Sequence, residues 1–241
     1  MSRLSTAALV LGAVSAAYLA AWSQAPAAPA ATTIAGYNPK VDPSKFSTNI
    51  TNKYFPLKRG TVHRYQGKRD GKPTLHVMTV THRTRTVMGV KCVVIEDVVT
   101  QNQSLVEKTT DWYAQDSSGN VWYFGEDTAE YQNGVVTSTA GTWEAGVDKA
   151  LPGIVMPSVP MVGKTYQQEW RPGVALDKAT ILNVNGTAHT PTKTYTHLVV
   201  TYDQNPLDPS KKEHKYFAPG VGFVFAVLAG GGHNETTWLV K

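Results

Sequence analysis

The sequence is poor in the residues that tie a fold together covalently. Its 241 residues include one cysteine, Cys92, so no intramolecular disulfide can form and the fold must be held by its core. In the apolar segment KCVVIEDVV this thiol is expected to be a small buried side chain and not a nucleophile. Charged residues make up only 17% of the chain and hydrophobic residues 41%, which is typical of one globular domain and excludes a disordered chain.

The common catalytic and cofactor motifs are also missing. There is no Gly-x-Ser-x-Gly elbow, no His-Glu-x-x-His pair and no Gly-x-Gly-x-x-Gly turn. The seven histidines are spread out, and none forms the His-x-His pair that would converge on a transition metal from one strand face. The sequence therefore predicts no catalytic residues, no metal site and no cofactor. Carboxylates for acid–base work can still be paired on paper, for example Glu144 with Glu169.

The excess of basic residues is small. The formal net charge is +5, and without Arg3 the remaining 22 basic and 18 acidic side chains leave +4. The basic residues are scattered, and none forms a stripe interleaved with aromatics, so nucleic-acid binding is not predicted. Weak association with an anionic envelope surface is compatible with this charge. We expect a monomer.

The first thirty residues have the pattern of a secretory signal. A basic start at Arg3 precedes an uncharged apolar run, Ser5 to Trp22, and a small-residue segment that ends in Ala28-Pro29-Ala30. This pattern predicts export, to the periplasm or the medium, with cleavage near Ala30. A retained membrane anchor is the alternative, because the apolar run is close to the minimum length that spans a bilayer. The fold is expected to be a single β domain over residues 31–241.

Turn signals indicate an all-β fold. Asp70-Gly71 and Asn133-Gly134 each separate two strand-like runs and supply the positive φ angles of a tight hairpin turn. Short runs rich in Val, Thr, Tyr and Trp alternate with turns about every ten residues. The prediction is an antiparallel meander that forms a strongly curved sheet, a half-barrel or a barrel. A Pro/Gly-rich segment at about 141–178 interrupts it, and we expect this segment to be a binding loop or lid.

The stretch DWYAQDSSGNVWYFGEDTAEY, residues 111–131, reads as an aromatic hairpin around Asp116–Asn120. Side chains alternate between the two faces of a strand. One face should therefore be core, and the other should be covered or line a concavity. The expected cross-strand pairs are Trp112 with Phe124, Ala114 with Trp122, and Tyr113 with Tyr123. The carboxylates that follow, Glu126, Asp127 and Glu130, are expected to form a solvated acidic turn.

Several segments resemble a family of uncharacterised exported bacterial β-proteins. They are TNKYFPLKRGT, DWYAQDSSGNVWYFGEDT, TWEAGVDKALPGIVMP, QQEWRPGVALDKA and EHKYFAPGVGFV, and the resemblance spans roughly residues 42–225. More distantly, the layout is similar to the unclosed β-barrel of lipoprotein-carrier envelope proteins. The resemblance implies a fold and a compartment, and it supplies no catalytic residues.

Three hypotheses about function follow. The leading one is an exported, non-catalytic β-protein that binds a small apolar or amphipathic ligand in its concave face. The second is hydrolysis of an envelope polymer by paired carboxylates, and the third is a structural or adhesive protein without a small ligand. For the first hypothesis the expected lining residues are Tyr113, Tyr123, Trp143, Tyr166 and Trp170, with the polar groups Glu144, Glu169 and His214.

Overall fold

The computed structural model describes residues 36–230 and 233–241. Tight turns with left-handed backbone angles reverse the chain between neighbouring strands. The φ angles are 52° and 76° at Asp70 and Gly71, and 52° and 78° at Asn133 and Gly134. Both pairs therefore reverse the chain between adjacent strands, as the sequence predicts.

Among the described residues the regular structure is strand, apart from one 3-10 turn, η2 (Pro43–Lys45). The strands are β1 (Phe46–Ser47), β2 (Val62–Arg69), β3 (Lys72–Val87), β4 (Val90–Gln101), β5 (Ser104–Asp116), β6 (Val121–Gln132), β7 (Val135–Ser138), β8 (Trp143–Glu144), β9 (Leu151–Met156), β10 (Thr165–Gln167), β11 (Glu169–Trp170), β12 (Lys178–His189), β13 (Thr194–Asn205), β14 (Asp208–Ala218), β15 (Gly222–Gly230) and β16 (His233–Leu239). This confirms the all-β prediction.

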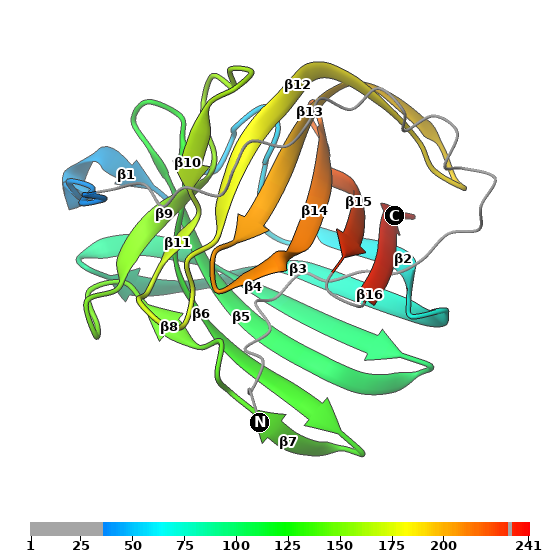
Figure 1. The fold of residues 1–241 in the computed structure, drawn as a ribbon. Helices are drawn as coiled ribbons and strands as arrows, with labels where there is room; N and C mark the ends of the chain where they lie inside the picture. Colours follow the sequence, from blue (N-terminus) through cyan, green and yellow to red (C-terminus); the bar gives the residue numbers. More distant parts are fainter. Residues whose placement is uncertain (1–35, 231–232) are drawn as a thin grey trace.

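Two consecutive meanders, β2 to β6 and β12 to β16, form one antiparallel sheet that nearly closes into a barrel with one seam (Figure 1). The meanders join where β16 pairs with β2, and the amide of Arg64 donates to the carbonyl of Lys241 at 2.7 Å. Closing a sheet on itself removes the exposed strand edges that promote aggregation.

The segment 141–178 is not one long loop, because it carries four short strands, β8 to β11. β8 and β9 pair with β6, β11 pairs with β9, and β10 pairs with β12 at the far end of the sheet. The chain thus crosses the seam between Gln167 and Glu169. The backbones approach closely there: a Cβ built on Gly153 would lie 2.2 Å from the carbonyl oxygen of Gln168.

The aromatic hairpin follows the predicted register near its turn and departs from it farther away. Tyr113 pairs with Tyr123 and Ala114 with Trp122, but Asp111 pairs with Glu126. One extra residue of β6 therefore lies opposite Trp112, so the expected simple pairing of Trp112 with Phe124 is replaced by a β-bulge. Gly125, with φ 135°, provides the backbone angle at this bulge.

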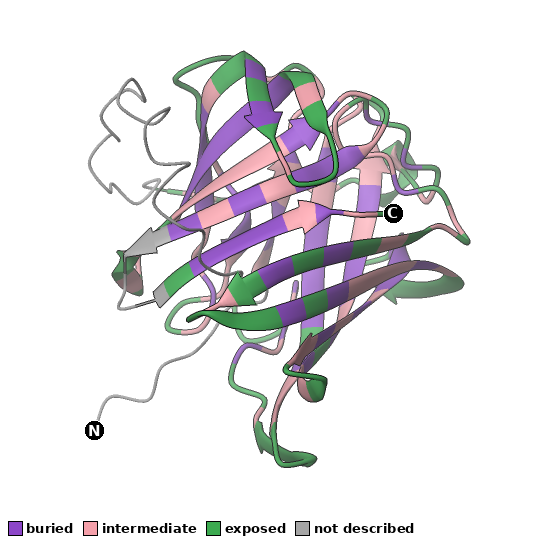
Figure 2. Cartoon of the chain, turned by 90° about the vertical axis from the view of Figure 1, so that its right-hand side faces the viewer, coloured by how far each residue is buried: buried purple, intermediate pink, exposed green. Residues whose placement is uncertain are grey.

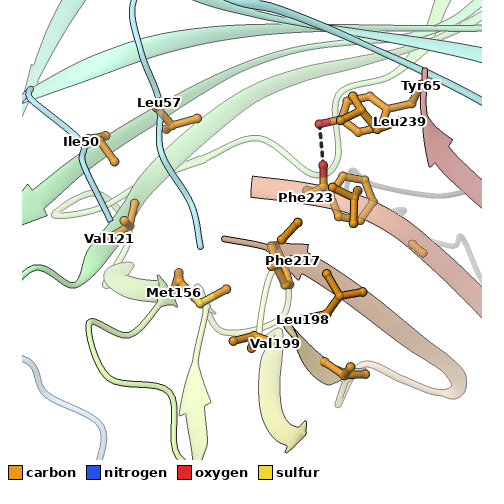
Figure 3. Close-up of a cluster of buried hydrophobic side chains, with 14 of the residues drawn as sticks. Ile50, Leu57, Tyr65, Val121, Met156, Leu198, Val199, Phe217, Phe223 and Leu239 are labelled. Atoms are coloured by element: carbon orange, nitrogen blue, oxygen red, sulfur yellow. Dashed lines mark hydrogen bonds between the residues drawn. The ribbon is translucent and has the colours of Figure 1, made fainter. Parts of the chain in front are cut away.

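Apolar side chains from both meanders meet in one cluster with side chains of the segment before β2, which we call the N-terminal arm (Figure 3). Ile50 and Leu57 of the arm are 3% and 4% exposed. In the same cluster the hydroxyl of Tyr65 donates to the carbonyl of Phe223 at 3.3 Å. Burial alternates with exposure along several strands, most visibly in the outer hairpins (Figure 2).

A second apolar cluster contains Trp112 and Phe124 on the other face of β5 and β6, and it extends to Trp143. It includes Cys92, whose pKa burial raises to about 12, so this thiol is a buried structural residue as expected. No helix in residues 36–230 and 233–241 is long and apolar enough to cross a membrane. The predicted secretory signal, residues 1–30, lies outside the described residues.

Candidate functional site

A pocket of about 390 Å³ lies where the 141–178 segment packs against β5 and β6. We call it the Trp143 pocket. Volumes of this order suit small ligands. Its walls combine indole rings, one valine and charged groups of both signs. The lining residues are Arg85, Trp112, Asp127, Thr142, Trp143, Glu144, Val147, Asp148 and Arg171.

The bulge in β6 positions the tryptophan and the glutamate of β8. Trp143 pairs with Glu126, and Glu144 pairs with Gly125. A Cβ on Gly125 would lie 2.4 Å from the carbonyl oxygen of Trp143. Because only glycine permits this approach, the sequence Phe-Gly-Glu within β6 places the pocket wall. The Trp143 ring meets Tyr123 edge-on, with centroids 5.4 Å apart.

Ion pairs hold the charged groups of the pocket in place. The guanidinium of Arg85 lies 4.2 Å from the centroid of the Trp112 ring and donates to the carboxylate of Glu144. Arg171 donates to the carbonyl of Thr142 and, at 3.0 Å, to Asp148. Guanidinium groups stacked on rings or bonded on two sides keep a defined orientation. The pocket therefore presents fixed positive and negative groups beside an aromatic wall.

The ring of Trp143 turns towards the barrel side, because Trp143 lies opposite Glu126 and packs against Tyr123. The residue is 2% exposed, and its Nε1 is buried with no partner in the described part of the chain. Buried indole N–H groups usually donate a hydrogen bond.

A second polar group is buried on the barrel side of β5 and β6. Asp111 lies directly opposite Glu126, on the same face of β5 as Tyr113, which packs against the first apolar cluster. Glu169 of β11 and Asp177 complete the set, since the carbonyl of Asp177 accepts the amide of Glu169 at 3.1 Å. We call Asp111, Glu126, Glu169 and Asp177 the acidic cluster.

Burial, followed by repulsion from neighbouring carboxylates inside and outside the set, raises the pKa of every carboxyl in the acidic cluster. Burial contributes most at Glu126, followed by the charge of Glu169. Burial also contributes most to the raised pKa of Glu169, followed by the charge of Asp177. The pKa of Asp177 is raised by burial to about 7. Like charges in a low-dielectric interior each favour the neutral form of the other.

The basic groups of the barrel interior are already paired with other carboxylates. Lys215 lies 2.9 Å from Asp203 and 3.3 Å from Glu213, and these two charges raise its pKa although burial opposes this. The imidazole of His76 lies 2.9 Å from Asp97, which raises its pKa against the effect of burial. Neither base forms an ion pair with the acidic cluster.

The predicted lining residues fall into three places. Tyr113, Tyr123 and Glu169 lie at or beside the acidic cluster. Tyr166 is half-buried, with its hydroxyl 3.4 Å from the carbonyl of Val155. Trp143 and Glu144 line the Trp143 pocket.

The remaining two predicted residues lie at neither place. Trp170 is half-buried, with its ring 5.5 Å from that of Tyr37. His214 lies 5.4 Å from the ring of Tyr202, and burial lowers its pKa. It alternates along β14 with Glu213 and Lys215, so it projects from the opposite face of the sheet.

The carboxylates suggested for hydrolysis are not brought together. Glu144 bonds Arg85 in the Trp143 pocket. Glu169 is 7% exposed in the acidic cluster, where its charged neighbours are Asp177, Lys215, Asp111 and Asp203.

The sequence does not predict most of the pocket or part of the acidic cluster. Arg85 and Arg171 come from segments far from the aromatic hairpin, and only folding brings them to Trp112 and Trp143. Glu126 was expected in a solvated turn, yet it is 1% exposed within β6. The bulge is the reason, because it turns Glu126 to the face shared with Asp111. No group of three or more His, Cys, Asp or Glu side chains among the described residues is arranged to hold a metal ion.

Comparisons with known proteins add little to this geometry. No family model matches the sequence, and no curated protein matches it. A Bacteroides fragilis protein, described as exported and as having a YmcC-like fold, aligns over 79% of this chain and 98% of its own, with 14% identity and a TM-score of 0.47. A Parabacteroides distasonis protein, described as a lipoprotein, aligns over 78% of this chain and 98% of its own, with 14% identity and a TM-score of 0.42. Similarities of this size assign neither a function nor a site.

Proposed function

We propose that this protein is an exported, non-catalytic β-protein that binds a small amphipathic ligand in the Trp143 pocket. The observation that carries the proposal is the pocket itself, in which an aromatic wall stands beside fixed charges of both signs. Ligand pockets typically combine apolar walls with a few polar groups that fix orientation. Export rests on the predicted signal at residues 1–30.

The polar groups indicate what the ligand head must carry. Arg85 and Arg171 line the pocket and carry more N–H donors than their ion pairs use, so they can bind an acceptor such as a carbonyl or carboxylate oxygen. Asp127 is exposed and belongs to no ion pair among the described residues, so it can accept from a donor. A head group with both an acceptor and a donor fits, and its apolar part would lie against Trp112 and Val147.

The ion pairs favour binding over catalysis. Hydrolysis by paired carboxylates needs two carboxyl groups that both act at the bond to be cleaved. Glu144 is bonded to Arg85 and Asp148 to Arg171, so both act as charge partners of arginine. Asp127 therefore has no second unpaired carboxylate among the lining residues of the pocket with which it could act as a catalytic pair.

Native mass spectrometry of protein exported by its own host tests the proposal. We expect a discrete added mass that is lost on denaturation. Glu144→Gln should release Arg85 from its ion pair, and Arg171→Gln should remove a donor from the pocket, so each should weaken ligand retention. A lost hydrogen bond to a charged group costs about 1.5–3 kcal/mol, or roughly 10- to 150-fold in Kd. Trp143→Ala is unsuitable, since truncating so buried a tryptophan costs about 3–5 kcal/mol of stability.

An ion pair outside the pocket supplies a matched control. Arg83 lies 2.6 Å from Glu96 on the exposed face of β3 and β4. Glu96→Gln should leave the added mass in place. Parent protein without any added mass, or full retention in both pocket variants, would refute the proposal.

A further inference from the structure

Three exposed apolar side chains lie together in one short loop. The loop joins β9 to β10 over residues 157–164 and projects beyond the ends of the strands (Figure 1). Val159, Met161 and Val162 are 68%, 52% and 62% exposed. Single apolar side chains scattered over a surface are normal, whereas a group of them marks an interaction site. We call residues 157–164 the apolar loop.

Hydrogen bonds at both ends fix the backbone of the apolar loop. At its start the amide of Ser158 donates to Oδ1 of Asn120 at 2.8 Å. At its end the amide of Gly163 donates to the carbonyl of Ile181 at 2.8 Å. The apolar side chains are therefore held in solvent by a loop of defined position, and the loop does not fold back onto the core.

The backbone of the apolar loop has few amide donors left to satisfy. Pro157 and Pro160 have no N–H, and the amide of Lys164 donates to the carbonyl of Met161 at 3.1 Å. Moving a backbone donor out of water is costly unless the donor is bonded. The prolines and the turn bond therefore lower the cost of placing this loop in the interfacial region of a bilayer.

Basic side chains flank the apolar loop. Lys164 ends it, and the N-terminal arm contacts its start, where Nδ2 of Asn52 donates to the carbonyl of Pro157 at 3.3 Å. Next to Asn52, the ammonium of Lys53 lies 5.1 Å from the centroid of the Tyr54 ring. Lysine and tyrosine side chains are typical anchors at membrane–water interfaces.

The acidic residue nearest in the neighbouring turn is Asp116, and it does not cancel this charge. Its carboxylate oxygens accept the amides of its own turn and the indole of Trp122. Residues 48–60, 116–120 and 157–164 together contain one acidic and four basic side chains, a net charge of +3. Such a surface complements an anionic one. The basic residues are Lys53, Lys58, Arg59 and Lys164.

We propose that the apolar loop docks this protein on an anionic lipid bilayer. Val159, Met161 and Val162 enter the boundary between headgroups and acyl chains, and Lys53 and Lys164 lie at the lipid phosphates. Binding of this kind strengthens with the buried apolar area and with the attraction to anionic lipids. A second copy of this chain fits the loop less well, because two surfaces with the same positive charge repel each other.

Cosedimentation of the protein exported by its own host with lipid vesicles tests the proposal. The vesicles contain either phosphatidylcholine alone or phosphatidylcholine with about one-third phosphatidylglycerol. We expect binding to the anionic vesicles to be at least about tenfold stronger. Changing Val159, Met161 and Val162 together to Ser should weaken it about tenfold or more. Lys53→Gln with Lys164→Gln should weaken it about tenfold on the anionic vesicles alone.

Two exposed valines at the other end of β6 supply a matched control. Val135 and Val136 of β7 are 65% and 48% exposed. They follow the turn at the end of β6, whereas the turn 116–120 beside the apolar loop precedes its start. Val135→Ser with Val136→Ser removes similar side chains and should leave vesicle binding unchanged.

A fluorescent label reports the insertion directly. Cys92 is the single cysteine and is buried, so a cysteine introduced by Val159→Cys or Val135→Cys can be labelled selectively with an environment-sensitive dye. On anionic vesicles the emission from position 159 should shift to the blue, and the emission from position 135 should not.

Several outcomes would overturn the proposal. They are vesicle binding that the triple serine variant retains in full, equal losses in the triple variant and the Val135/Val136 control, and no emission shift at position 159. A change of oligomeric state in the triple variant without an effect on vesicle binding would identify a second copy as the occupant. The apolar loop contributes no lining residue to the Trp143 pocket, so none of these outcomes depends on a ligand there.

Discussion

Tyr113 and Tyr123 face each other across the β5–β6 ladder, with 12° between their ring planes. Of the two hydroxyls, that of Tyr123 donates a hydrogen bond to the carboxyl group of Asp111. Asp111 is 4% exposed, and burial followed by the charge of Asp97 raises its pKa. The pair therefore combines a packing contact common to both residues with a polar contact made by one.

Tyr123→Phe should destabilise the protein more than Tyr113→Phe. Both variants keep the ring stack, but the first leaves the Asp111 carboxyl without its donor, which costs about 1–3 kcal/mol. Tyr113→Phe should change the free energy of unfolding by less than about 0.5 kcal/mol. Urea unfolding at pH 7 measures both. Equal effects would mean that the hydroxyl bond contributes nothing to stability.

Stability should rise as the pH falls from 8 towards 6. Burial raises the pKa of Asp177 and Glu213 to about 7 and that of Glu235 to about 8, whereas unfolded carboxyls titrate near 4. Folding therefore takes up protons between pH 4 and 8, and the free energy of unfolding decreases as the pH rises through this range. The lowered pKa of His63 opposes this trend below about pH 6.5.

Thermal scans across this pH range provide the measurement. We expect a loss of at least about 1 kcal/mol between pH 6 and 8, because each pKa unit corresponds to 1.36 kcal/mol. Asp177→Asn should make the profile flatter. A stability maximum at pH 8 in the parent protein would contradict the raised pKa values.

Asp116→Ala should unfold the tip of the aromatic hairpin. One carboxylate oxygen accepts the amides of Ser118 and Asn120, each at 2.9 Å, and the other accepts the indole of Trp122 at 2.8 Å. Removing an acceptor of several hydrogen bonds should cost about 2 kcal/mol. Ser117→Ala, at an exposed position of the same turn, is the control and should have little effect. Chemical denaturation with tryptophan fluorescence reports both.

The sequence could predict the features that depend on local chemistry. Asp70-Gly71 and Asn133-Gly134 determine hairpins because few other residue pairs adopt two positive φ angles. The Tyr113–Tyr123 pairing follows from the turn between the two strands. These features involve neighbours in the chain, so a single sequence contains the necessary information.

The candidate site depends on features that a single sequence does not reveal. The bulge opposite Trp112 shifts the register by one residue, and such a shift moves Glu126 from the solvent to the interior. Arg85 and Glu144 are 59 residues apart and meet only because β8 pairs with β6. The seam forms because the 141–178 segment pairs with both ends of the sheet. The prolines and glycines of this segment predict a loop and do not indicate such pairing.

Gly153→Ala should open this seam. The added methyl group would lie 2.2 Å from the carbonyl oxygen of Gln168 and 2.7 Å from that of Gln167, both backbone atoms that cannot rotate away. β9 and the chain between β10 and β11 must then separate, and we expect a loss of at least about 2 kcal/mol, within the range of overpacking.

Gly134→Ala is the matched control for this substitution. A Cβ at Gly134 meets no atom within 4 Å, although its φ of 78° makes alanine unfavourable by about 1 kcal/mol. Hydrogen exchange should show faster exchange of the Gln168 and Glu169 amides, which donate to the carbonyl of Asp177, in the Gly153 variant alone. Unchanged exchange at both amides would show that the barrel does not depend on close backbone contact at Gly153.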